Sequence, residues 1–216
     1  MNQTLRLWRL PAGLLLLSLV PAIAGTVRLL QIAQGAAVTP ENARFLTAPV
    51  PAALHIVSVV VYCMLGAFQF VPRIRSRYPA WHRWSGRVLV PAGLIASVSG
   101  LWMTFFYPWP QYDGQGLYLI RIGVGAVMTY GLIVATIAIL KKDVARHRAW
   151  MMRAYALGLG AGTQVLTHIP WLLLPDYHNE TFRTISMAAG WGINAAVVEW
   201  RLSGSRFRAQ KGEDHA

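Results

Sequence analysis

The sequence predicts an all-α fold, a bundle of six helices that span a membrane. Of its 216 residues, 55% are hydrophobic and only 13% are charged, whereas a soluble domain carries about a quarter charged residues. Long apolar runs recur along the chain, and the basic residues gather in every second link between them. This composition excludes a soluble enzyme, a secreted domain held by disulfides and a disordered regulator. The single cysteine can form no internal disulfide.

Six apolar runs are long enough to cross a bilayer as helices, which takes about 20 residues. Prolines follow several of them, as is typical where a helix ends. The predicted spans are 10–30, 50–71, 86–106, 117–140, 149–174 and 183–200. We expect a single transmembrane domain over residues 1–202, with its core at 50–174. A basic, disordered cytoplasmic tail follows at 203–216.

The first span has a second interpretation. Arg6 and Arg9 precede a leucine-rich run, and the Ala-Ile-Ala sequence at 22–24 follows it, so the segment resembles a signal peptide with its cleavage site. We expect a retained span that is kinked at Pro21. Cleavage would leave five helices, with the other five spans unchanged.

The basic residues predict the orientation. Of the 20 lysines and arginines, 16 fall on one side, in the N-terminus, the second link, the fourth link and the tail. Such an excess marks the cytoplasmic side, so we expect both termini in the cytoplasm of a bacterial inner membrane. The topology explains the net charge of +12, and we expect membrane lipids as partners and no nucleic acid. The four remaining basic residues are Arg28, Arg44, Arg121 and Arg183.

The second and fourth links resemble each other. Each carries a His-Arg pair, a tryptophan and a further arginine, and each then opens a helix. The pattern predicts a quasi-repeat of two helical hairpins, formed by the second and third spans and by the fourth and fifth. Chance similarity between two membrane-interface loops is the alternative. The residues are His82, Arg83, Trp84 and Arg87 in HRWSGR, and His147, Arg148, Trp150 and Arg153 in HRAWMMR.

Four histidines form two predicted pairs. His55 and His168 lie at matched depth, roughly 8–9 Å below the outer edge of their spans, and His82 and His147 lie at the inner boundary. An ionisable side chain inside a span is costly and therefore indicates function. Two neutral imidazoles from different helices can ligate a haem iron axially. We expect His55 and His168 to ligate haem b, and His82 and His147 to hold a second haem or a lipid head group.

This arrangement resembles the two-haem transmembrane b cytochromes in the depth and helix origin of the histidines. It departs from them in one respect, because His147 and His168 are 21 positions apart, about 31 Å along a helix. Other interpretations stay open. His55 and His168 could instead bond neighbouring helices or relay a proton or a substrate, and the His-Arg pairs could bind lipid phosphates.

Several further side chains could support such a site. Gln69 and Gln164 lie within spans, where each could bond a neighbouring helix, a haem propionate or a quinone. Arg121 could extend to the interface, pair with Asp113 or neutralise a propionate. We also expect support from the link residues Arg83, Arg87, Arg148 and Arg153.

Glycines at 158, 160 and 162 in the fifth span allow two interpretations. They could let helices approach closely, or they could clear space for a flat macrocycle.

Taken together, five sequence features resemble a bacterial family of predicted membrane proteins, domain of unknown function 2306. They are His55, the GAFQF segment at 66–70, the HRxxGR segment at 82–87, Ser99-Gly100 and the HRxWMxR segment at 147–153. The resemblance covers roughly residues 50–170. It implies a multi-span inner-membrane protein, with no established reaction, and it makes His55, His82 and His147 the first positions to test.

The leading functional hypothesis is haem-dependent electron transfer by a membrane oxidoreductase, with a quinone or a redox partner protein. The first alternative is a cofactor-free transporter or a membrane scaffold or assembly subunit. The second is a lipid-modifying enzyme that uses inner-face histidines and arginines. The sequence contains no nucleotide-binding, zinc-protease or serine-hydrolase motif.

Overall fold

The computed structural model describes residues 3–213, and the side chains of residues 8–204. Within that range the chain folds into helices and contains no strand, which confirms the all-α class, whereas the number of six spans stays a prediction. The longer helices are α1 (Gln3–Ala33), α3 (Pro49–Gly66), α5 (Pro79–Phe106), α6 (Gln115–Leu140), α7 (Val144–Gly158), α8 (Gly160–Thr167) and α10 (Glu180–Glu213). The short ones are α2 (Ala43–Thr47), η1 (Ala67–Phe70), α4 (Pro72–Arg77), α9 (Ile169–Leu173) and η2 (Pro175–Tyr177).

Four helical segments of the described chain are long and apolar enough to cross a membrane. They match the first four predicted spans and are Trp8–Ala33, Pro49–Phe70, Pro79–Phe106 and Gln115–Leu140. Both limits of each segment lie within a few residues of the predicted ones, except that the third segment starts seven residues earlier than predicted. That extension turns the second half of the basic second link into the first two turns of α5, while α4 contains the first half.

The predicted fifth span is wrong as a single helix. Residues 149–174 are divided among α7, α8 and α9, with breaks at Leu159 and His168. Three alternating glycines, which are poor helix formers, surround the first break. Pro170, which lacks a backbone N–H and constrains the residue before it, follows the second. Broken helices are tolerated at membrane depth where neighbouring helices cover them.

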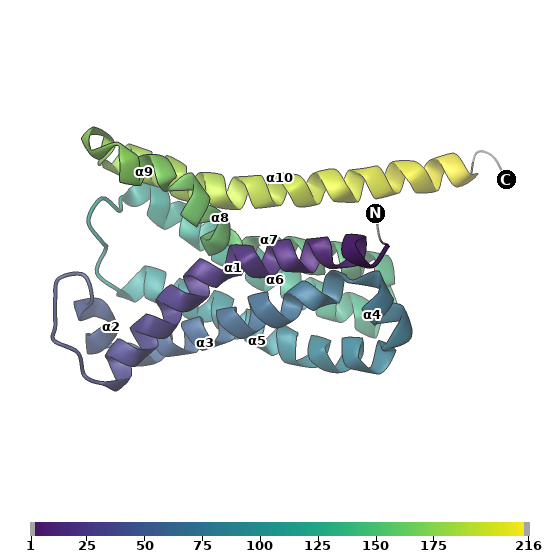
Figure 1. Cartoon of the computed structure of the whole chain (residues 1–216), viewed down its shortest axis with the longest axis horizontal. Coiled ribbons are helices and arrows are strands. Elements are labelled where there is room, and N and C mark those ends of the chain that lie inside the picture. Colours follow the sequence, from purple (N-terminus) through teal and green to yellow (C-terminus); the bar gives the residue numbers. More distant parts are fainter. Residues whose placement is uncertain (1–2, 214–216) are drawn as a thin grey trace.

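Helix α10 contains the predicted sixth span, 183–200, and is not among the four apolar helices. It runs along the outside of the bundle and continues past it (Figure 1). It packs mainly on α8 and α7. The helix continues to Glu213, so the tail keeps helical backbone over most of 203–216, and residues 214–216 lie outside the described chain. Disorder of that tail stays a prediction.

The bundle has two ends, which we name by their short helices. The start of α1, the end of α10 and helix α4 lie toward one end, the α4 end, whereas α2 and α9 lie at the opposite α2 end (Figure 1). The most extensive helix contacts join α3 to α5 and α6 to α7, and α5 then packs on α6. These are the helices of the two predicted hairpins; the repeat itself stays a prediction.

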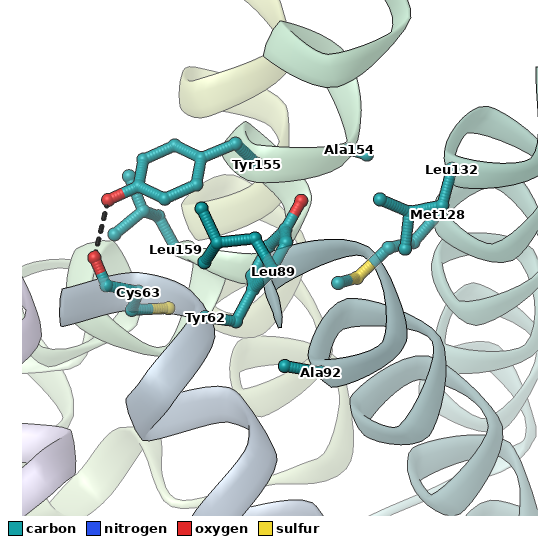
Figure 2. Close-up of a cluster of buried hydrophobic side chains, with 9 residues drawn as sticks. All are labelled: Tyr62, Cys63, Leu89, Ala92, Met128, Leu132, Ala154, Tyr155 and Leu159. Carbon is teal, nitrogen blue, oxygen red and sulfur yellow. Dashed lines mark hydrogen bonds between the residues drawn. The ribbon is translucent and has the colours of Figure 1, made fainter. Parts of the chain in front are cut away.

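A buried cluster joins the four central helices (Figure 2). Tyr62 of α3 is 1% exposed and packs against Tyr155 of α7, whose hydroxyl donates a hydrogen bond of 2.7 Å to the Cys63 carbonyl. Leu89 and Leu132, from α5 and α6, are buried in the same cluster. The two hairpins therefore form one core.

Helix α1 belongs to this bundle. It packs on α3 and α8, and it bends part of the way along its length (Figure 1). Pro11 and Pro21 both lie inside the helix, where a missing N–H and a ring clash cause kinks. At Gly162 the backbone of α8 approaches Leu17 so closely that a Cβ would lie 2.3 Å from the Leu17 carbonyl oxygen.

Candidate functional site

His82 and His147 come together at the α4 end of the bundle. His82 lies in the first turn of α5 and His147 in the first turn of α7. His82 is close enough to His147, Arg75 and Arg83 for their charges to interact. The His82 Nδ1 is buried and has no hydrogen-bond partner. Two histidines that are 65 positions apart in the sequence thus lie at the same end of the bundle, within range of electrostatic interaction.

The orientation of His147 is fixed by its neighbour α6. Its Nδ1–H donates a hydrogen bond of 2.9 Å to the Ala135 carbonyl. In a neutral imidazole this bond leaves the lone pair on Nε2, which is the usual arrangement of a histidine that ligates a metal. The same bond equally serves to join α7 to α6.

Around this pair, the predicted supporting arginines behave differently from one another. Arg83, Arg87 and Arg148 are exposed. Arg153 is half-buried and forms a two-pronged ion pair with Glu199 of α10, at 2.5 and 2.9 Å, with its guanidinium 5.0 Å from the ring centre of Trp150. Arg153 therefore attaches α10 to α7, while the other three remain available at the surface.

Gln69 and Gln164 are each bonded inside the protein. The Gln69 side chain donates to the hydroxyl of Ser85, which is 1% exposed and in turn donates to the Trp81 carbonyl. Gln164 donates to the Met187 carbonyl at 3.0 Å. Both glutamines join helices, which is the first of the interpretations that the sequence allows.

His55 faces α5. Its Nδ1–H donates a hydrogen bond of 2.8 Å to the Ala96 carbonyl and lies 3.3 Å from the Ser99 hydroxyl. The ring lies against Gly100, where a Cβ would come within 3.2 Å of it. The glycine thus makes room for the imidazole itself, and His55 joins α3 to α5.

His168 lies at the break between α8 and α9. Its Nδ1–H donates to the Gln164 carbonyl of its own helix at 2.9 Å, and its Nε2 is buried without a hydrogen-bond partner. In the described part of the chain, α8 packs on α1 and α10, and it has no extensive contact with α3. Convergence of His55 and His168 on one site stays a prediction.

The glycines of the fifth span serve close packing. A Cβ at Gly158 would meet the ring of Tyr62 at 2.9 Å, and one at Gly160 would meet the Trp191 ring at 2.1 Å. Protein atoms therefore occupy the space that a macrocycle would need beside these glycines. Of the two interpretations that the sequence allows, helix approach is the one observed.

At the α2 end, Asp113 accepts hydrogen bonds from both Arg121 and Arg183. The Asp113 side chain is 2% exposed, although it lies in the loop between α5 and α6. The sequence indicates the Arg121 pair, but it does not indicate that Arg183, 70 positions away, completes it. One signal in the sequence points to it, because both arginines are among the four basic residues that fall outside the N-terminus, the two basic links and the tail.

Two further observations bear on ligands. Among the described residues, no three His, Cys, Asp or Glu side chains are grouped as a metal ion would require, although a haem iron needs only two histidines. A cavity of about 260 Å³ opens near the α4 end and is lined by both apolar and charged residues. Its lining residues are Val134, Ile137, Ala138, Lys141, Asp143 and Arg146.

Comparisons with known proteins agree with this description of an apolar helical bundle. Neither the curated proteins nor the solved structures contain a significant match. The family model described as predicted membrane protein, domain of unknown function 2306, matches residues 52–201. This stretch contains α5 to α9, His55, His82, His147 and His168, and most of α3 and α10. The chain therefore belongs to this family of predicted membrane proteins.

Proposed function

We propose that this integral membrane protein crosses a bacterial cytoplasmic membrane six times, with both termini in the cytoplasm. Four apolar helices support the first four spans. The segments α7 to α9 together have the length of a fifth, and α10 has the length of a sixth. The start of α1 and the end of α10 lie toward the same end of the bundle, as an even number requires (Figure 1). The packing of α1 on α8 supports its retention.

Reporter fusions test this orientation. An enzyme that is active only in the cytoplasm, fused before Met1 or after Trp200, should be active at both positions. A fusion in the loop at 108–114 should report the periplasm. A periplasmic reading after Trp200 would contradict the six-span proposal, because it leaves an odd number of crossings.

For the chemistry, we propose that the protein binds b-type haem through paired histidines and transfers electrons as a membrane oxidoreductase. The observation that carries this proposal is the pair at the α4 end. His82 and His147 come from two similar links, lie within interaction range, and each keep a ring nitrogen without a protein hydrogen bond. The exposed arginines Arg83, Arg87 and Arg148 could neutralise the propionates.

A bound haem would supply one-electron chemistry at this end of the bundle. His82 and His147 would hold its iron, and the Ala135 carbonyl would keep the His147 ring in the tautomer that presents Nε2. The position at the cytoplasmic boundary would allow exchange with a quinone or a redox partner protein. His55 and His168 remain the residues proposed to ligate the other haem, in the half of the bundle toward the α2 end. Their Nδ1 atoms are likewise bonded to carbonyls.

Absorption spectra of the purified full-length protein, produced with ample haem, test this proposal. We expect a Soret band and sharp α-bands on reduction. His82→Ala and His147→Ala should each abolish the bands of the haem that this pair holds, whereas His178→Ala should leave them unchanged. Membrane insertion and thermal stability, measured in parallel, separate loss of haem from loss of fold. A colourless wild-type protein would contradict the proposal.

The cavity near Lys141 favours a second candidate, a cofactor-free membrane protein that binds anionic lipid. Among its lining residues, Val134, Ile137 and Ala138 fit an acyl chain, while Lys141 and Arg146 fit a phosphate. This is the chemistry expected of the scaffold or transporter alternative. Retention of anionic over zwitterionic lipid by a colourless wild-type protein, reduced in Lys141→Gln, would favour it.

A further inference from the structure

Four arginines from four different helices meet at the α2 end, and we call them the arginine cluster. They are Arg28 of α1, Arg44 of α2, Arg121 of α6 and Arg183 of α10. Arg44 is close enough to the other three, and to Asp113, for all these charges to interact. All four side chains are half-buried, although a solvated arginine would extend into water.

Asp113 compensates only part of this charge. Its carboxylate accepts from Arg121 and Arg183 and is almost fully buried. A second acidic side chain, Glu180, packs on Gly114, the neighbour of Asp113. Glu41 is exposed and is bonded to Thr39. Asp113 is the carboxylate that pairs with Arg121 and Arg183, so the four guanidinium groups leave an excess of positive charge at this place.

Arg44 carries the clearest sign of an absent partner. Its Nε is buried and has no hydrogen bond. Burial lowers the pKa of Arg44 below its ordinary value, and the three neighbouring guanidinium groups lower it further, although Asp113 raises it. A half-buried cation without a hydrogen-bonded anion is an expensive arrangement, so the fold keeps it only where something stabilises it.

The aromatic neighbours hold the unpaired guanidinium groups in place without neutralising them. Arg28 and Arg44 lie over the ring of Phe45, at 4.5 and 4.6 Å from its centre. Phe45 in turn packs edge-on against Tyr107, whose hydroxyl donates to the Ala48 carbonyl. The two cations are thus oriented in advance of any ligand, which reduces the entropy lost on binding.

We infer that the arginine cluster is a binding site for a phosphate group. A guanidinium donates two parallel hydrogen bonds to such a group, and several guanidiniums can share its oxygens. The excess positive charge suits a phosphate monoester, which carries about −1.5 to −2 at neutral pH. His168 borders the cluster beside Arg183, and its buried Nε2 is a second polar atom without a partner. This site is independent of the haem proposed between His82 and His147, whereas His168 is also a residue of the other proposed haem.

The phosphate has two possible sources. It could belong to the head group of a lipid, because the cluster lies at one end of the membrane-spanning helices. It could also be a phosphorylated solute that reaches the α2 end from water. The recognition chemistry is the same in both cases, so the experiment uses one probe for each.

Binding is measured on the full-length protein in detergent, by calorimetry and by thermal unfolding. Inorganic phosphate is the soluble probe, with chloride at matched ionic strength as reference. Phosphatidic acid in mixed micelles is the lipid probe, with phosphatidylcholine as reference. Stabilisation by inorganic phosphate assigns the site to a solute, and stabilisation by phosphatidic acid alone assigns it to a lipid. No response to either probe would overturn the inference.

Variants locate the binding. Arg44→Gln should lower the affinity for whichever probe binds the wild type by about tenfold or more, since a charge-assisted hydrogen bond is lost. Arg28→Gln provides a second test if Arg44→Gln does not fold, because the Arg28 side chain bonds only to Gln31 of its own helix. The matched control is Arg73→Gln, an exposed arginine of the α4 end, which should bind as the wild type does. Equal loss in Arg73→Gln, or wild-type affinity in both cluster variants, would overturn the inference.

Discussion

The two ends of the bundle use the same residue type in different ways. At the α4 end, the arginines of the second link are exposed, and they include Arg73, Arg75, Arg77, Arg83 and Arg87. At the α2 end all four arginines are half-buried, and two of them hold Asp113. The first set needs only to stay in water on one side of the membrane. The second set supports the fold, so the number of charges predicts orientation whereas their burial indicates structure and binding.

The ion pairs of α10 differ in the same way, because one has a buried carboxylate and the other an exposed one. Asp113 is 2% exposed at the α2 end, whereas Glu199, the partner of Arg153, is 55% exposed. Both carboxylates connect α10 to the rest of the bundle. Because water and salt screen exposed charges, the two pairs should differ several-fold in their contribution to stability.

The largest effect is expected from Asp113→Asn. The change removes the charge that two half-buried guanidiniums share, and loss of one partner from a buried pair destabilises a protein by about 3–5 kcal/mol. Since both arginines are partly exposed, we expect about 2–4 kcal/mol. Unfolding of the purified protein in a denaturing detergent series measures it. Asp143→Asn is the control, because asparagine replaces aspartate well as the N-cap of α7; equal losses would remove the contrast between the ends.

A smaller loss is expected from Ser85→Ala, which tests whether the α4 end also depends on buried polar contacts. The substitution leaves the Gln69 amide without its acceptor beside a fully buried position. We expect about 1–2 kcal/mol of destabilisation in the same unfolding assay. Ser76→Ala, which changes an exposed serine of α4, should have no measurable effect. A loss as large as that of Asp113→Asn would show that the two ends depend equally on buried polar contacts.

Glu199→Gln should cost less, about 0.2–1 kcal/mol, because its ion pair with Arg153 is open to solvent. The difference from wild type should shrink as salt is raised from low concentration to about 1 M, where the Debye length falls to about 3 Å. Asp113→Asn should keep most of its effect under the same conditions. A salt-independent loss in Glu199→Gln would show that this pair acts as a buried one.

The smallest effect on stability is expected from Arg73→Gln, within about 0.5 kcal/mol, as for most surface substitutions. Its effect should fall on orientation instead. When Arg75 and Arg77 are replaced as well, the bias that keeps the second link in the cytoplasm weakens, and a reporter fused there should show mixed orientation. A large loss of stability in the single variant would contradict the solvated role of this end.

Local properties of the sequence were sufficient for part of this description. Apolar runs of bilayer length predict the first four spans, because a backbone in lipid must satisfy its own hydrogen bonds and a helix does so within one segment. The recurrence of His-Arg with tryptophan predicts that His82 and His147 lie at the same end of the bundle. The reason is that the links of two helical hairpins with the same orientation lie on the same side. The family resemblance, over roughly 50–170, is confirmed by the match over 52–201.

Other features depend on which segments meet in space, and no local pattern carries that information. The first break in the fifth span, at Leu159, lies next to positions where α8 meets Trp191 and the backbone of α1, segments distant in the sequence. His55 bonds Ala96, 41 positions away, because helix packing selects the neighbour that its ring faces. The arginine cluster joins four helices around one loop carboxylate. The charges of the cluster interact through space, whatever their separation in the sequence. The cluster therefore exists only once the bundle has formed.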